Sequence, residues 1–129
     1  MAIEGLGVDQ ATWKPAPPRH SIWQIVRHVT LWKQGVLESW DGRKPDYDEM
    51  ERTDWQDVAG DERSWQADVQ ALHRVSMRLK ERLSALDDAA LYQAFEGEEM
   101  LTALRILRMA THDIYHAGQI QYIRALQKG

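Results

Sequence analysis

Three stretches of this chain carry apolar residues at spacings of three and four, which places them on one face of an α-helix. No stretch shows the alternation of apolar and polar residues that a half-buried strand requires. We therefore predict an all-α, up-down helical bundle that forms one domain over residues 1–129. The apolar positions of the three stretches are Ile22, Ile25, Val26, Val29, Trp32, Val36 and Trp40; Trp65, Val69, Leu72, Val75, Leu79, Leu83 and Leu86; and Leu101, Leu104, Leu107, Tyr115, Tyr122, Ile123 and Leu126.

The flanking residues set the expected ends of these helices. Ser21 is a suitable N-cap for the first, and Asp41-Gly42 is a suitable stop. We expect the second helix to begin near Glu62 and the third to run from about residue 98 to residue 127. The third stretch has a second apolar face, so we expect that helix to be central in the bundle.

Two other segments are predicted to be connections. Residues 1–20 contain three prolines and two glycines, which leave room for no more than a short helical turn near residues 8–13. Residues 41–61 are polar and acidic, without helical periodicity. A connection of that length in a small domain often covers a functional site, and we expect Trp55 to fix it to the body.

Composition narrows the classes of function. With no cysteine, disulfides, thiolate nucleophiles and Cys-ligated zinc are excluded. A net charge of −4 with interspersed basic residues argues against nucleic-acid binding. No apolar run is long enough to cross a membrane and no signal peptide is visible, so we expect a cytoplasmic protein. The six tryptophans are expected to fill the core.

His112 and His116 are the first candidate site residues. They lie four apart, so a helix presents both imidazoles on one face, a spacing that zinc-binding helices use. The alternative is two ordinary histidines in a packed helix. We expect Tyr115 to pack between them and Gly118 to mark a close approach of a neighbouring helix.

His28 is the candidate third ligand, because it borders the apolar stripe of the first long helix. Two helices of a bundle could then bring three neutral imidazoles to one point and leave a further position for water, an open catalytic arrangement for zinc. The alternative is a boundary histidine that bonds to a backbone carbonyl. His20 and His73 are expected at the surface.

Three charged residues near the pair have two interpretations each. Asp113 stands where zinc proteases with an HExxH motif have glutamate, so it is a candidate general base; otherwise it orients an imidazole or forms a salt bridge. Arg105 and Arg108 share the stripe of His112. Either they extend to the bundle surface, or they form a cationic rim that binds a carboxylate- or thiol-bearing substrate or cofactor near the metal.

Two segments, "RHSIWQIVRHVTLWKQGVLESWDG" and "MATHDIYHAGQIQYIR", together with "DW" between them, resemble the DinB-like superfamily of metal-dependent enzymes. The resemblance implies a four-helix bundle with one divalent metal, usually nickel or zinc. Its ligands would be one histidine of the second helix and two of the fourth, which correspond to His28, His112 and His116. Relatives include thiol-dependent S-transferases and a mycothiol-dependent isomerase, so a low-molecular-weight thiol is an implied cofactor.

The chain departs from that family at its start, where only "MAIEGLGVDQATW" stands in place of a long first helix. A displaced start, a truncated chain or coverage of the exposed groove by a second subunit would each explain this, and we expect a homodimer. The leading hypothesis is a metal-dependent transferase or hydrolase acting on a small molecule, with no nucleic-acid or membrane partner. The alternative is a stress-related metal-binding helical protein without catalysis.

Overall fold

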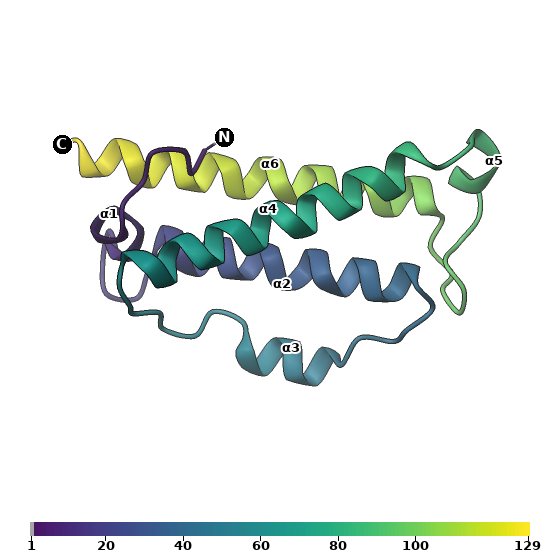
Figure 1. Cartoon of the computed structure of the whole chain (residues 1–129), viewed down its shortest axis with the longest axis horizontal. Helices are drawn as coiled ribbons and strands as arrows, with labels where there is room; N and C mark the ends of the chain where they lie inside the picture. Colours follow the sequence, from purple (N-terminus) through teal and green to yellow (C-terminus); the bar gives the residue numbers. More distant parts are fainter. Residues whose placement is uncertain (1) are drawn as a thin grey trace.

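The computed structural model describes residues 2–129, and within them every element is a helix. The prediction of an all-α bundle is confirmed. Three helices are long and three are short (Figure 1). They are α1 (Val8–Thr12), α2 (Ile22–Trp40), α3 (Tyr47–Thr53), α4 (Glu62–Ser84), α5 (Asp88–Leu91) and α6 (Thr102–Gln127).

The predicted up-down order is not observed, because the long helices do not simply alternate in direction. The connection that contains α3 runs back along the whole bundle, so α2 and α4 are parallel and α6 is antiparallel to both (Figure 1). Contacts agree with this order: Trp23 packs on Trp65 near the start of α2 and α4, and Asp41 pairs with Arg82 near their ends. The length of the 41–61 connection therefore determines the topology.

Local sequence explains where α2 begins and ends. The Ser21 hydroxyl accepts the backbone N–H of Gln24 at 3.2 Å, and the Gln24 side chain accepts the N–H of Ser21 at 2.9 Å. This capping box satisfies two donors that the first turn leaves unpaired. Gly42, with φ at +77°, turns the chain out of the helix, as the sequence predicts.

Two tryptophans form the centre of the core. Trp23 and Trp65 are almost fully buried and meet edge to face with ring centroids 5.6 Å apart. The indole N–H of Trp65 donates to the carbonyl of Leu6 at 2.8 Å, which attaches the N-terminal segment to α4. Three other tryptophans are partly buried and Trp13 is exposed, so the expectation that all six fill the core is only partly met.

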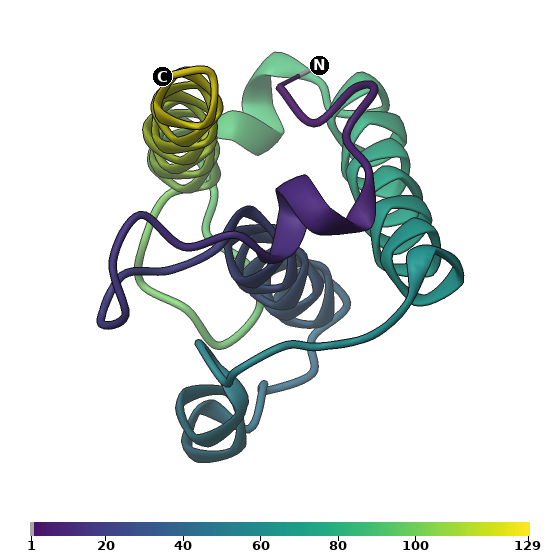
Figure 2. The ribbon, with the colours of Figure 1, turned by 90° about the vertical axis from the view of Figure 1, so that its left-hand side faces the viewer.

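The expectation that the last helix is central is wrong. α2 packs against both α4 and α6, which contact each other little, so α2 is the central helix (Figure 2). α6 leaves one apolar face uncovered: Leu107 is 60% exposed, Ile114 72% and Tyr122 67%. We call this surface the outer face of α6. Apolar periodicity marks such a face whether or not anything covers it.

The connections also differ in detail from expectation. The 41–61 segment contains α3, capped by Asp46 and anchored through buried Met50. α6 begins at Thr102 rather than near residue 98, because Thr102 bonds to the carbonyl of Gln93 and Gly97 adopts φ +77° in the preceding turn. None of the helices within residues 2–129 has the length and apolar character that crossing a membrane would require.

Candidate metal centre

The histidines His28, His112 and His116 meet in one cluster between α2 and α6. The Nε2 atom of His112 lies 3.0 Å from Nε2 of His28 and 3.1 Å from Nε2 of His116. The three ligand atoms all lie within 4.8 Å of one another. Because α2 and α6 are antiparallel, residues 84 positions apart in sequence face each other here.

The opposite ring nitrogens of two of these histidines are held by oxygen acceptors. His28 Nδ1 lies 2.8 Å from Oδ1 of Asp54, and His116 Nδ1 lies 2.6 Å from Oε1 of Gln119. Both acceptors require a proton on Nδ1, which fixes the neutral tautomer with a lone pair on Nε2. Acceptors of this kind orient metal-binding histidines in general.

The resulting geometry fits a divalent metal. With protons on Nδ1, the Nε2 lone pairs of His28 and His116 both point toward His112, and a single proton on His112 Nε2 can satisfy only one of them. Zinc–nitrogen bonds of 2.0–2.1 Å at tetrahedral angles place the ligand nitrogens about 3.3 Å apart. The observed separations of 3.0 and 3.1 Å are close to that value. The cluster can therefore hold one metal ion.

Burial favours the neutral, metal-coordinating form of two of these imidazoles, His28 and His112. His28 is 9% exposed and His112 is partly buried. Burial is the main cause that lowers the pKa of His28 below 6.5, although the hydrogen bond that His28 donates to Asp54 acts in the opposite direction. Burial likewise lowers the pKa of His112, and the neighbouring His116 and His28 add to the effect.

Trp55 connects the 41–61 segment to this cluster. Its ring stacks between His20 and His28, with centroid distances of 4.0 and 4.1 Å. Trp55 adopts φ +60°, the left-handed conformation that side chains other than glycine rarely accept, at a cost of about 1–2 kcal/mol. This backbone turn sets the ring of Trp55 and the carboxylate of Asp54 against the same imidazole. The expectation that Trp55 fixes the segment to the body is confirmed.

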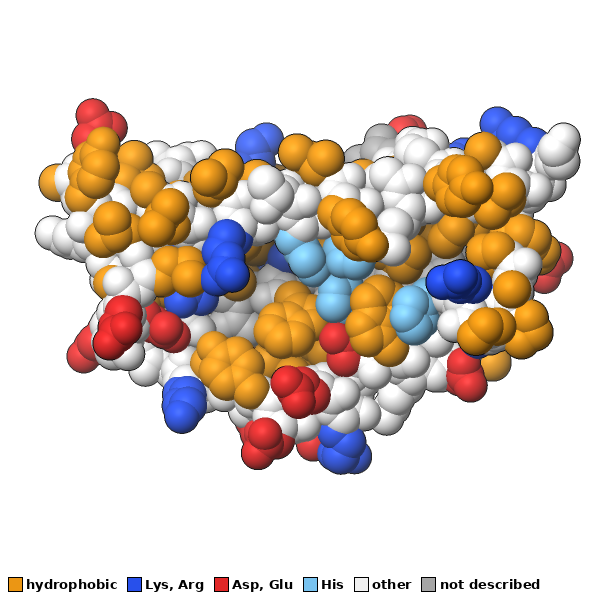
Figure 3. Space-filling view, turned by 180° about the vertical axis from the view of Figure 1, so that it is seen from behind, with side chains coloured by type: hydrophobic (Ala, Val, Ile, Leu, Met, Phe, Trp, Pro, Cys, Tyr) orange, Lys and Arg blue, Asp and Glu red, His pale blue; other side chains and the backbone are white. Residues whose placement is uncertain are grey.

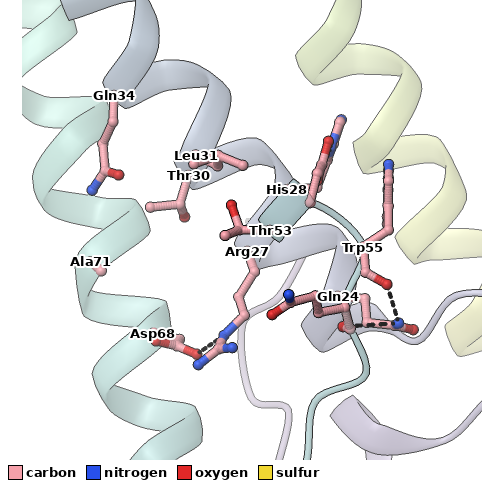
Figure 4. A pocket seen from close by; sticks show the side chains of 12 residues that line it. Gln24, Arg27, His28, Thr30, Leu31, Gln34, Thr53, Trp55, Asp68 and Ala71 are labelled. Atoms are coloured by element: carbon pink, nitrogen blue, oxygen red, sulfur yellow. Dashed lines mark hydrogen bonds and ion pairs between the residues drawn. The ribbon is translucent and has the colours of Figure 1, made fainter. Parts of the chain in front are cut away.

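A cavity of about 210 Å³ lies beside this stack, between α2, α4 and residues 53–56. Figure 4 shows the side chains that line it. Its charged groups are already paired, because Arg27 donates to Asp68 at 2.7 Å. The Gln24 amide donates to the carbonyl of Trp55 at 3.2 Å. The Gln24 bond holds the loop that carries Asp54. Among residues 2–129, the charged groups that line this cavity all have partners.

A larger cavity of about 400 Å³ lies between α2 and α6, and we call it the α2–α6 cavity. His112 forms part of its wall, so it adjoins the three-histidine cluster. Histidine side chains are visible at the surface in the middle of this side of the molecule, with basic side chains nearby (Figure 3). The cluster is thus reachable by a small molecule from this cavity.

Asp113, Arg105 and Arg108 all line the α2–α6 cavity, as does Lys33. Asp113 forms a salt bridge with Lys33 at 2.9 Å and contacts none of the three imidazoles by hydrogen bond within residues 2–129. Arg105 pairs with Glu98 at 3.2 Å. Of the interpretations open for Asp113, the salt bridge is the one observed.

Sequence reasoning missed the residues that orient the ligands. Asp54 was recognised only as part of the "DW" pattern, and Gln119 had no assigned role, although its position three residues after His116 puts it on the same helix face. Tyr115 does not pack between His112 and His116: it is 63% exposed, its ring meets His116 edge to face, and its hydroxyl accepts from the Gln119 amide. Gly118 faces open space within the described chain, so the predicted close approach is absent there.

Comparison with known proteins agrees with the fold and the cluster. None of the curated proteins matches the chain significantly. The family model of the DinB superfamily matches residues 1–120, a range that includes all three histidines and the segment that carries Asp54. With this match over most of its length, the chain belongs to the DinB superfamily.

Proposed function

We propose that this protein is a divalent-metal-dependent enzyme that acts on a small molecule. Its ion, zinc or nickel, would be held by His28, His112 and His116. The observation that carries the proposal is the convergence of three Nε2 atoms next to a cavity that can take a ligand. Three protein ligands are the pattern of catalytic sites, whereas structural zinc sites have four.

The ion would act as a Lewis acid and lower the pKa of a water or thiol, which makes either a nucleophile near neutral pH. The chain has no cysteine, so a thiol has to come from a diffusible low-molecular-weight compound. The proposed reaction is therefore a transfer to a small thiol or a hydrolysis. Imidazole ligands suit zinc and nickel alike.

The chain's own groups would orient the site and move a proton. Asp54 and Gln119 hold two imidazoles with their lone pairs directed to one point. Asp113 has a buried Oδ1 atom with no hydrogen-bond partner within residues 2–129, on the wall of the cavity beside His112. That oxygen is the proposed proton acceptor for a ligand in the cavity, with the other carboxylate oxygen held by Lys33.

The first test is metal analysis of the protein purified after expression with added zinc and nickel. We expect about one equivalent of ion in the wild-type protein and a large loss in His112→Ala. His73→Ala is the matched control, because His73 is an exposed histidine on α4. Less than about 0.2 equivalents in the wild type would refute a metal site of useful affinity.

A second measurement separates an enzyme from a non-catalytic protein whose ion only joins α2 to α6. Chelation of the ion is followed by thermal melting and by screening for thiol transfer and hydrolysis. We expect the chelated protein to stay folded and any turnover to disappear. Two results together would favour the non-catalytic alternative: the protein unfolds when the ion is removed, and the wild-type protein shows no turnover.

A further inference from the structure

Four of the residues that line the α2–α6 cavity are apolar. They are Trp32 and Val36 of α2, Met109 of α6, and Met100 in the segment before α6. A volume of about 400 Å³ is at the small end of the range for ligand pockets. Its occupant therefore has a compact apolar body.

The same cavity carries more positive than negative charge. Its wall contains three cations, Lys33, Arg105 and Arg108, and a single carboxylate, Asp113. Lys33 is paired with Asp113 at 2.9 Å, and Arg105 is paired with Glu98 at 3.2 Å. This leaves one cation to account for.

Arg108 is that cation. It is exposed, and within residues 2–129 it forms no ion pair; its closest polar contact is Sδ of Met100 at 3.9 Å from Nη1. On the same wall, the Nε–H of Arg105 is buried and finds no acceptor among the described residues 2–129. Guanidinium groups bind carboxylates through paired N–H donors, and a buried donor without an acceptor is costly.

We infer that the α2–α6 cavity binds a small carboxylate with an apolar body, and that Arg108 binds the carboxylate group. The apolar body lies against Trp32, Met100 and Met109, and His112, which would hold the proposed ion, lies in the same cavity wall. This inference rests on the proposed function for its catalytic meaning, but the binding itself needs no ion. It names the substrate class of the site.

The test uses 3-phenylpropionate and its neutral analogue 3-phenylpropanamide, titrated into metal-free protein and followed by calorimetry. We expect the carboxylate to bind more tightly than the amide. Arg108→Gln should weaken carboxylate binding about 10- to 100-fold and leave amide binding unchanged. Arg74→Gln, an exposed arginine of α4 outside the cavity, is the matched control and should change neither.

The position of the probe can be read from methionine methyl groups labelled with ¹³C. We expect the signals of Met100 and Met109 to shift when 3-phenylpropionate binds. The signals of two other methionines should not shift: Met50, a buried residue of α3, and Met77, which is exposed on α4. Shifts confined to the first pair place the ligand in the α2–α6 cavity.

Equal affinity for the two probes, no saturable carboxylate binding up to about 10 mM, or an unchanged carboxylate affinity in Arg108→Gln would each overturn the inference. Its failure is distinct from failure of the proposed function. A protein that binds the carboxylate through Arg108 but takes up no metal supports the inference alone. A protein that binds metal but does not prefer the carboxylate supports the proposed function alone.

Discussion

Replacing Asp54 with asparagine should weaken metal binding while the fold stays intact. The side chain of Asp54 is only 9% exposed and accepts two N–H donors: Nδ1 of His28 at 2.8 Å and Nε1 of Trp32 at 2.8 Å. Asparagine keeps one acceptor oxygen and replaces the other with an NH₂ donor. Nδ1 of His28 also lies 2.9 Å from Oδ2, the oxygen that accepts from Trp32, so in either orientation of the amide it loses one of its two oxygen contacts to the NH₂ group.

The orientation of the new amide determines the effect on His28. If its oxygen accepts from Trp32, its NH₂ group faces Nδ1 of His28. That contact favours the tautomer in which Nδ1 accepts and Nε2 carries the proton, so the nitrogen that faces His112 is no longer free to coordinate. Loss of such a partner generally lowers metal affinity 10- to 100-fold, which corresponds to about 1.4–2.8 kcal/mol.

Competition of each variant with a chromophoric zinc chelator near pH 7.5 measures the dissociation constant, and circular dichroism reports the fold. Asp57→Asn is the matched control, because Asp57 lies three residues later, is 89% exposed and pairs with Lys14 away from the histidines. We expect it to bind zinc as the wild type does. An Asp54→Asn dissociation constant within twofold of the wild-type value would refute the argument from tautomers.

Three further outcomes follow from other features of the structure. Because burial lowers the pKa values of His28 and His112 below 6.5, the unfolded chain binds more protons than the folded chain under acidic conditions. The metal-free protein should therefore keep its full stability above about pH 6.5 and lose stability as the pH falls. Urea melts across this pH range measure the effect, and a stability that does not change with pH would contradict it. We propose that the outer face of α6 joins two copies of the chain in a homodimer. Light scattering should then give twice the chain mass of 15.0 kDa for the wild type and the mass of one chain for Leu107→Glu. A monodisperse wild-type monomer would contradict this proposal. Gly60→Ala should lower the free energy of unfolding by about 1–3 kcal/mol, because the added Cβ would lie 2.9 Å from the buried ring of Trp23. An unchanged midpoint of urea unfolding would contradict this and show that the ring can shift.

Much of the bundle could be predicted because its signals are local. Apolar spacing located the three long helices, and Ser21 and Gly42 marked the ends of α2. α3 was missed because it is seven residues long and buries only Met50, which leaves no periodic stripe to detect. Periodicity also could not show whether a partner covers the second face of α6, so α6 was wrongly expected to be central.

The candidate metal centre was likewise predictable only in the parts whose signals are local in sequence. Spacing on one helix paired His112 with His116, and His28 became a candidate from its position beside the apolar stripe of α2, which the wider resemblance then supported. Asp54 belongs to a loop, and only the tertiary structure brings a loop residue against α2. Asp113 follows His112 directly, which turns it about 100° around the helix and toward Lys33 instead of the imidazoles.

The strained backbone at Trp55 has a consequence for control of the site from a distance. Trp55 helps to attach the 41–61 segment to the bundle, and its neighbour Asp54 sets the proton position on His28, a proposed ligand. A proteolytic cut or a competing protein that releases this segment would weaken ion binding. By thermodynamic linkage, ion binding would oppose the release of the segment by the same factor. Ion affinity would then be adjustable at α3, without any change to the three histidines.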